Sequence, residues 1–187
     1  MRNDIIHVAT TLFKEQGYAT VSLNDIAQRV GIRKPSLYHH FPRGKEEIYL
    51  ASILRLFENF REMVEETASL QVLLEEKLYR IAEWFDEHYP LSLISMMHQD
   101  MPKLSTPMRE ELFIQIREQV FLPIVDMLSR SMELGEIERR LEPTVATGSI
   151  LALIEGAFAT TSLHHRPVLM EQLRKSLTVF VDGLRCK

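Results

Sequence analysis

The sequence predicts an all-α protein, and three observations support that fold class. Apolar residues recur at three- and four-residue spacing in successive segments, as they do on the buried face of an amphipathic helix. No long segment alternates apolar and polar residues in the way a half-buried β-strand does. Glycine is sparse, with 7 residues among 187, while a hydrophobic content of 45% is enough to bury a core. We therefore expect about nine helices.

Charge is unevenly distributed between the first 50 residues and the rest of the chain. Residues 1–50 contain seven Lys or Arg and five Asp or Glu, a balance of +2. Because the whole chain carries −4, the remaining residues must sum to −6. A mildly basic N-terminal part joined to an acidic remainder is typical of a protein that contacts a polyanion with one end.

Two helices are expected at the start of the chain, the first at residues 3–16. Gly17 ends that helix as a left-handed C-cap. Ser22 is the expected N-cap of the second helix, and Asp25 stands where a capping box usually has Glu or Gln. Gly31 then allows a sharp turn into a third helix.

The third helix is expected to be short, at residues 34–40, with an outward face rich in cations and hydrogen-bond donors. Pro35 fits there because its missing N–H would have no intrahelical partner in the first turn. Leu37 and Phe41 are expected to point inward. The residues left facing outward are Arg33, Lys34, Ser36, Tyr38 and His39. Such side chains suit phosphate oxygens and base edges in the major groove, and the two preceding helices must hold so short a helix in place.

Residues 5–50 resemble the DNA-binding head of the TetR family of bacterial transcriptional repressors. The matching residues are Ala9, Leu12, Phe13, Gly17, Tyr18, Ser22, Ile26, Ala27, Val30, Gly31, Leu37, Tyr38, His39, His40, Phe41 and Lys45. The resemblance implies a helix-turn-helix domain at residues 1–48 and a helical ligand-binding and dimerisation domain at residues 49–187.

The resemblance also implies DNA contacts. The residues it assigns are Ser22, Arg33, Lys34, Pro35, Ser36, Tyr38, His39 and Lys45. Ser22, Tyr38 and Lys45 would bind phosphates, with Lys45 acting beside a helix N-terminus. Arg33 stands where the family usually has a Ser or Thr N-cap, whose loss costs about 0.5–2 kcal/mol, so we infer that Arg33 contacts a guanine or a phosphate. Two structural alternatives stay open: Tyr38 could fill the core of the head, and Lys34 could be a solvated charge.

Six further helices are expected after residue 44. Their ranges are 45–68, 69–88, 91–101, 106–134, 142–164 and from Pro167 onward. The helix at 45–68 should belong to the head at one end and to the body at the other, which makes it the mechanical link between them. Pro123 should kink the helix at 106–134, because it removes one backbone hydrogen bond.

The last two helices have features of a dimer face. Small residues recur every four positions at Gly148, Ala152 and Gly156, which permits close helix approach. A stripe of larger apolar residues follows at Leu169, Leu173, Leu177 and Phe180. Together with a second copy these helices would form a four-helix bundle. The alternative is two ordinary core helices.

The middle of the chain is rich in aromatic residues and in methionine, which adapts to variable shapes. The candidate ligand-binding residues are Phe57, Phe60, Trp84, Phe85, His88, Tyr89, Met97, His98, Met101, Phe113 and Phe121. They would line a pocket for a small, largely apolar effector. The alternative for each residue is plain core, and the expectation that a pocket exists rests on the family resemblance.

No catalytic motif is present in the sequence. It lacks a phosphate-binding loop, a dinucleotide fingerprint, a zinc-protease motif, paired cysteines and a nucleophile elbow. His98 with Asp100, and His164 with His165, could bind a metal, but no third ligand stands at a telling spacing. We therefore expect no enzymatic activity, no cofactor and no metal site.

The compartment is indicated by two further features of the chain. The single cysteine, Cys186, favours a reducing compartment, and no apolar run approaches the roughly 18 residues that span a bilayer. A cytoplasmic protein without membrane contact is expected.

These expectations combine into a homodimeric, ligand-responsive repressor. Its partners would be a pseudo-palindromic double-stranded DNA operator, a second copy of the chain and a small-molecule effector. Two alternatives stay open from the sequence: an activator of the same fold, and a helical binding module without DNA binding.

Overall fold

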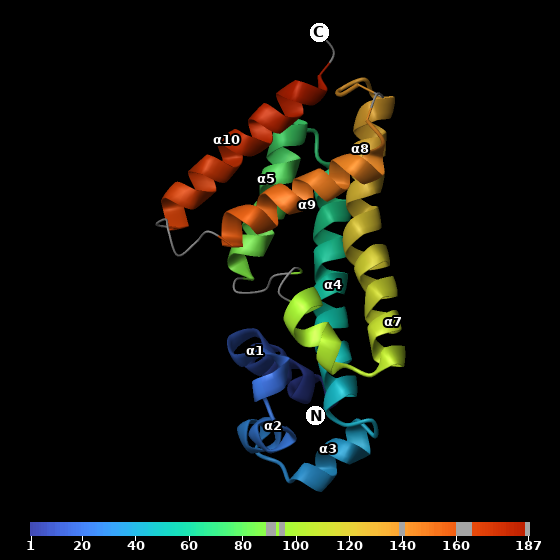
Figure 1. Ribbon diagram of the computed structural model, residues 1–187, viewed down its shortest axis with the longest axis vertical. Coiled ribbons are helices and arrows are strands. Elements are labelled where there is room, and N and C mark those ends of the chain that lie inside the picture. Colours follow the sequence, from blue (N-terminus) through green and yellow to red (C-terminus); the bar gives the residue numbers. More distant parts are fainter. Residues whose placement is uncertain (89–92, 94–95, 139–140, 160–165, 186–187) are drawn as a thin grey trace. The chain divides into compact units, whose positions relative to one another are not determined.

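The computed structural model describes residues 1–88, 93, 96–138, 141–159 and 166–185, and every regular element in those ranges is a helix (Figure 1). The α-helices are α1 (Arg2–Thr20), α2 (Leu23–Val30), α3 (Lys34–His40), α4 (Lys45–Ser69), α5 (Leu74–Glu87), α7 (Thr106–Gln115), α8 (Leu122–Glu133), α9 (Pro143–Ala159) and α10 (Arg166–Leu184). Two π-helices, η1 (Met96–Asp100) and η3 (Ile116–Phe121), and the 3₁₀-helix η2 (Met101–Lys103) complete the set. The predicted all-α class is confirmed. Within these ranges every helix is too short or too polar to cross a membrane.

The chain forms two compact units. Unit 1 consists of residues 1–59 and 93–116, and unit 2 of residues 60–92 and 117–187. Helix α4 contributes its first part to unit 1 and its last part to unit 2. The boundary predicted after residue 48 divides the chain by expected role rather than by compactness, and it stays a prediction.

The start of unit 1 follows the local signals of the sequence. Gly17 has φ 75° and interrupts the helical backbone within α1. The capping box at the start of α2 forms with both of its bonds: Ser22 N donates to the Asp25 carboxylate at 2.8 Å, and Asp25 N donates to Ser22 Oγ at 3.2 Å. Gly31 ends α2 in the left-handed conformation, with φ 79° and ψ 30°. The core beneath these helices is formed by Ile5, Ala9, Ile26, Leu37, Phe41 and Ile48.

Two of the predicted helices have different limits. Helix α5 begins at Leu74 rather than at residue 69, because the preceding residues form the connection from α4. Leu73 belongs to that connection and is 69% exposed, although it lies within the range predicted as helix. The helix predicted at 91–101 is replaced at its C-terminal end by η1 and η2, while residues 91, 92, 94 and 95 lie outside the described part.

The long helix predicted at 106–134 is interrupted rather than only kinked. Helix α7 passes into the π-helix η3, and α8 begins at Leu122. Pro123 has no N–H to donate to the carbonyl four residues earlier, so regular α-helical bonding cannot continue through it. The turn before Pro123 adopts the wider π-helical pairing instead.

Unit 2 is held together by packing among its last helices. Helix α10 packs along α5 and against α9, and α9 also packs against α8 (Figure 1). Leu169, Leu173 and Leu177 of α10 are buried within this unit. The Arg174 guanidinium adds a surface contact, lying 3.9 Å from the Tyr79 ring centroid and 3.2 Å from a Glu76 carboxylate oxygen.

Candidate nucleic-acid interface

The backbone between α2 and α3 fixes the direction of the short third helix. Ile32 N donates to the carbonyl of Ala27 at 2.9 Å, which closes the turn after Gly31. At the other end of α3, Phe41 N donates to the carbonyl of Leu37 at 2.8 Å. Leu37 and Phe41 are buried, so they anchor α3 to the core of unit 1. Such a helix is held by tertiary packing rather than by its own stability.

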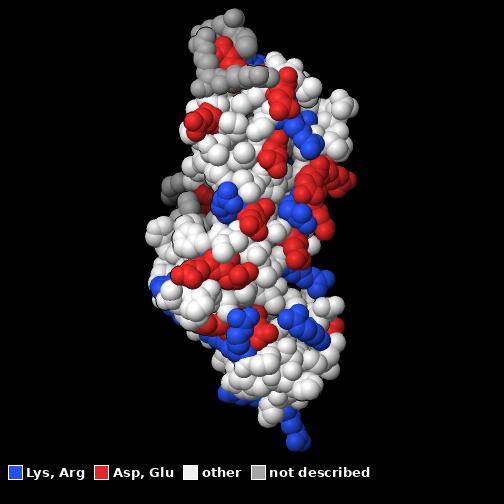
Figure 2. Space-filling view, turned by 90° about the vertical axis from the view of Figure 1, so that its right-hand side faces the viewer, with Lys and Arg blue, Asp and Glu red and all other residues white. Residues whose placement is uncertain are grey.

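The outward face of α3 carries the residues that the sequence placed there. The exposed side chains are Arg33, Lys34, Pro35, Ser36, Tyr38 and His39. In Figure 2 a few separate Lys and Arg side chains lie among residues of other kinds at the end of unit 1 that carries α3. The donors therefore form one accessible surface that suits phosphate and base-edge contacts.

Tyr38 is a surface residue rather than a core residue. Its side chain is 44% exposed. One edge of its ring lies against the backbone of Gly44, where a Cβ atom would come within 3.4 Å of the ring. The loop between α3 and α4 thus orients the ring and leaves the hydroxyl group available.

Arg33 occupies the N-cap position of α3 without capping it. Its backbone is extended, with φ −86° and ψ 146°, and its side chain makes no cap hydrogen bond. The first N–H groups of α3 therefore lack the acceptor that a Ser or Thr would supply. The guanidinium is left free to act outside the helix.

Lys45, one of the predicted phosphate-binding residues, already contacts other groups of unit 1. Lys45 begins α4, and its Nζ donates to the carbonyl of Ala19 at 3.4 Å and lies 4.2 Å from the Tyr18 ring centroid. Burial lowers the pKa of the Lys45 ammonium, and the Asp100 carboxylate partly opposes that shift. A phosphate contact by Lys45 therefore competes with contacts inside unit 1.

Glu46, Tyr49 and Ser105, which the sequence analysis did not select, make hydrogen bonds at the start of α4. Ser105 donates to the Glu46 carboxylate from 59 residues further along the chain. Tyr49 donates to the carboxylate of Asp100, which lies 51 residues after it. The sequence marked Asp100 only as a metal ligand without a third partner. No local pattern marks such pairs, because nothing in helical periodicity relates residues so far apart.

The predicted ligand-binding residues are divided between the two units. Phe57, Met97, His98, Met101 and Phe113 belong to unit 1, and Phe60, Trp84, Phe85, His88 and Phe121 to unit 2, while Tyr89 lies outside the described part. In unit 2 the Trp84 ring packs 4.8 Å from Phe60 and stacks at 3.9 Å on His88, measured between centroids. Phe60 and Trp84 are buried, so these aromatic rings pack with one another in the core.

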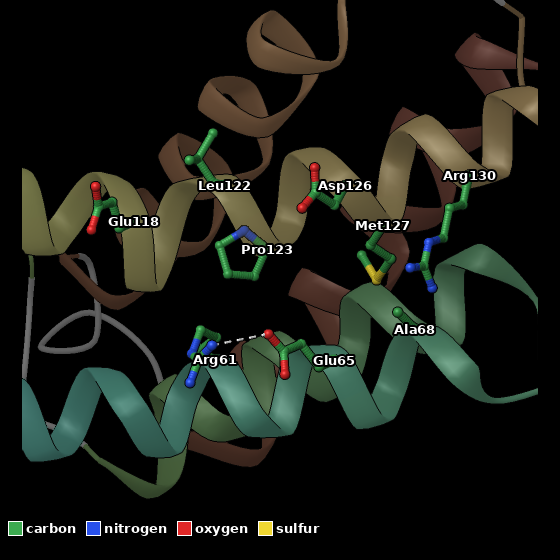
Figure 3. A pocket seen from close by; sticks show the side chains of 9 residues that line it. All are labelled: Arg61, Glu65, Ala68, Glu118, Leu122, Pro123, Asp126, Met127 and Arg130. Atoms are coloured by element: carbon green, nitrogen blue, oxygen red, sulfur yellow. Dashed lines mark hydrogen bonds and ion pairs between the residues drawn. The ribbon is translucent and has the colours of Figure 1, made fainter.

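Unit 2 also has a hollow of about 490 Å³ between α4 and α8, and its lining is largely charged (Figure 3). The lining residues are Arg61, Glu65, Ala68, Glu118, Leu122, Pro123, Asp126, Met127 and Arg130. Arg61 pairs with Glu65 at 3.5 Å. None of the predicted ligand-binding residues lines this hollow.

The residues predicted for a dimer face have two different environments. Gly148, Ala152 and Gly156 are exposed along α9, with open space where a Cβ would stand on either glycine. Leu169, Leu173 and Leu177 are instead buried against the other helices of unit 2, and Phe180 is only partly exposed. The exposed apolar residues on these two helices are Val145, Val168 and Val179. Of the residues predicted for the dimer face, the leucines are therefore buried within the subunit and the small residues of α9 are exposed.

The described part of the chain contains no group of three or more His, Cys, Asp or Glu side chains placed to hold a metal ion. His164 and His165, which the sequence pairs as a weak metal candidate, lie outside it.

Comparisons with known proteins agree with this geometry. Residues 5–52 match the family model described as bacterial regulatory proteins, tetR family. The chain is 32% identical over 126 residues to the negative transcriptional regulator IcaR of the biofilm operon icaADBC in Staphylococcus epidermidis, covering 60% of this chain and 67% of that protein.

Solved structures resemble the whole chain. The transcriptional regulator PfmR from Thermus thermophilus has a TM-score of 0.71 and 27% identity, with 100% of this chain and 98% of that chain covered. The regulator FadR from Bacillus subtilis, in complex with stearoyl-CoA, has a TM-score of 0.78 and 19% identity, with 99% and 100% covered.

Proposed function

The chain belongs to the tetR family of bacterial regulatory proteins, and we propose that it is a repressor that binds a pseudo-palindromic operator as a homodimer and leaves it when a small, largely apolar effector binds. It is a transcriptional regulator. The negative regulation named for IcaR supports repression over activation, since that relative is matched over most of its length.

The exposed face of α3 is the observation that carries the proposed DNA contact. Arg33 at its N-cap and the helix itself present two cations, a hydroxyl, a phenol and an imidazole, all exposed, while Leu37 among them is buried. Arg33 and its neighbours would read base edges, while Ser22, Tyr38 and Lys45 would bind phosphates. The Ser22 hydroxyl can donate to a phosphate because its capping contact uses it only as an acceptor.

A homodimer is proposed because one α3 offers a small contact surface. Two copies would place their α3 helices in successive major grooves, about 34–36 Å apart. The strip of small and apolar residues on α9 and α10, including Gly148, Ala152, Gly156 and Val179, supports a close contact between copies.

The proposed effector site lies in the body, and its chemistry is inferred from two observations. Unit 2 combines a buried aromatic cluster at Phe60 and Trp84 with a charged hollow between α4 and α8. The structural neighbour FadR was solved with stearoyl-CoA, a molecule with both an apolar and a charged part. A signal from this region would reach the head through α4, which contributes to both units.

Binding to DNA tests the proposal directly. Fluorescence anisotropy would compare a duplex from the region upstream of the coding sequence with a scrambled duplex, at several salt concentrations. If Arg33 reads a base, Arg33→Ala should reduce the difference in binding free energy between the two duplexes by about 1–3 kcal/mol. Arg55→Ala is the matched control, because Arg55 is also exposed in unit 1 but lies outside the proposed interface.

The outcomes separate the parts of the proposal. Equal, weak binding of both duplexes by the wild-type chain would contradict operator recognition. Equal effects of Arg33→Ala and Arg55→Ala would contradict the role of Arg33. An effector response would be supported if stearoyl-CoA or another amphiphile released the wild-type chain from the operator duplex. The same compound should have no effect on the complex of the Arg33→Ala chain with the scrambled duplex.

A further inference from the structure

Two hydrogen-bonded contacts join residues 100–105 to the first turns of α4, inside unit 1. Ser105 donates twice to the Glu46 carboxylate, from its backbone N at 2.8 Å and from its Oγ at 2.7 Å. The Tyr49 hydroxyl donates to the Asp100 carboxylate at 3.0 Å. Glu46 and Tyr49 are three residues apart, so both contacts meet nearly the same side of α4.

The contact at Tyr49 continues to the lysine at the start of α4. The Tyr49 ring packs 4.8 Å from the Tyr18 ring, and the Tyr18 ring lies 4.2 Å from Lys45 Nζ. The π-helix η1, which ends at Asp100, packs against α1, the helix that contains Tyr18 (Figure 1). A displacement of Asp100 would therefore shift the Tyr49 and Tyr18 rings, and with them the ring that Lys45 contacts.

Electrostatics indicate that these groups share one environment. Burial above all, and then the Asp100 carboxylate, raise the pKa of the Tyr49 hydroxyl. Burial and the carboxylates of Glu46 and Asp100 raise the pKa of Tyr18 to about 12. Both phenols therefore stay neutral donors at physiological pH, and the Tyr49–Asp100 bond is a charge-assisted one.

We propose that Asp100 and Ser105 are positioning residues for DNA binding, which hold the first turn of α4 and thereby set the place of Lys45. Neither residue lies on α2 or α3, and neither touches DNA in this scheme. The inference rests on the proposed function, because it concerns the same operator contact. It adds that residues 100–105 control how tightly the head binds the phosphate backbone.

Two variants of equal charge isolate the hydrogen bond from the charge of Asp100. Asp100→Asn keeps an oxygen that can accept from Tyr49, whereas Asp100→Ala removes it. We expect Asp100→Ala to bind the operator duplex about tenfold more weakly than Asp100→Asn, with unfolding midpoints measured alongside. Ser105→Ala, at an exposed position, should weaken binding by about threefold, since the backbone donor to Glu46 remains.

The decisive measurement repeats the Asp100 pair in a Lys45→Ala background. If Asp100 acts by placing Lys45, the difference between Asp100→Ala and Asp100→Asn should fall below about twofold there. An undiminished difference would show that Asp100 acts by another route and would overturn the inference, as would equal binding of the two variants with Lys45 present. Failure of the wild-type chain to bind any duplex would overturn the proposed function as well, which the other two outcomes leave intact.

Discussion

Two residues on α10 provide a sharp test of the proposed dimer face. Val179 is 72% exposed, while Leu173 is 2% exposed and packs inside unit 2. We consider Val179→Arg and Leu173→Ala, together with the control Gln71→Arg at an exposed position in the connection between α4 and α5. The first change places a charge on the proposed interface, and the second leaves a cavity in the core.

The expected magnitudes follow from burial. Truncating a buried leucine to alanine costs about 2–5 kcal/mol. For a chain of this size each kcal/mol lost from the free energy of unfolding lowers the thermal unfolding midpoint by roughly 2–4 °C. The midpoint of Leu173→Ala should therefore fall by between about 4 and 20 °C. Val179→Arg should change the stability of the isolated subunit by less than about 0.5 kcal/mol, because its site is open to solvent there. In a dimer formed through this face, each added charge would be buried against the partner copy.

The assay measures association and unfolding separately. Sedimentation velocity at several protein concentrations should show Val179→Arg dissociating where the wild type and Gln71→Arg remain dimers. Urea unfolding should show the large loss for Leu173→Ala. A Val179→Arg chain that dimerises as tightly as the wild type would refute the strip as the interface. A loss below about 1 kcal/mol for Leu173→Ala would refute its place in the core.

Three further predictions concern unit 1. Gly31 has φ 79°, and no neighbouring atom lies within 4 Å of the position that a Cβ would take. Substitutions there should destabilise the fold least with Asn, more with Ala and most with Val, and chemical unfolding should show a loss of about 1 kcal/mol for Ala. Because folding raises the pKa of Tyr18 from 10.0 to about 12, its stabilising effect is complete below pH 10 and is lost as pH rises toward 12, so Tyr18→Phe should flatten that part of the stability profile. Ser22→Ala should lose about 0.5–2 kcal/mol of stability through the capping box, and Ser22→Asp, which keeps a cap, should recover it while weakening DNA binding through its charge.

The short-range features of the head could be predicted closely. Helix α3 spans the residues expected for it, because Gly31 and Pro35 mark its start and the buried Leu37 sets its inward side. The capping box forms although Asp25 is shorter than the usual Glu. These features depend on residues a few positions apart, which is the range over which backbone preferences and capping act.

Features that depend on distant partners were harder to predict. The stripe of leucines on α10 predicted an apolar face that a second copy would cover, but periodicity does not say what covers such a face. In the structure α10 packs against α5 and α9 with Leu169, Leu173 and Leu177 buried, whereas Val168 and Val179 of the same helix are exposed. The ring cluster of Phe60 and Trp84 was ambiguous for the same reason, since a buried aromatic residue looks alike in a core and beside a ligand.

The compact units also differ from a division by expected role, and this difference has a mechanical consequence. Residues 93–116 come from the region expected to belong to the body, yet they pack with the DNA-binding helices in unit 1. Their bonds to Glu46 and Tyr49 attach them to α4 directly. A conformational change that begins in this segment can therefore alter the start of α4, and the contacts of Lys45, without first unfolding or repacking any helix of the head. Coupling of this kind requires only that a ligand favour one of two positions of the segment, by a free energy comparable to the few hydrogen bonds that hold it.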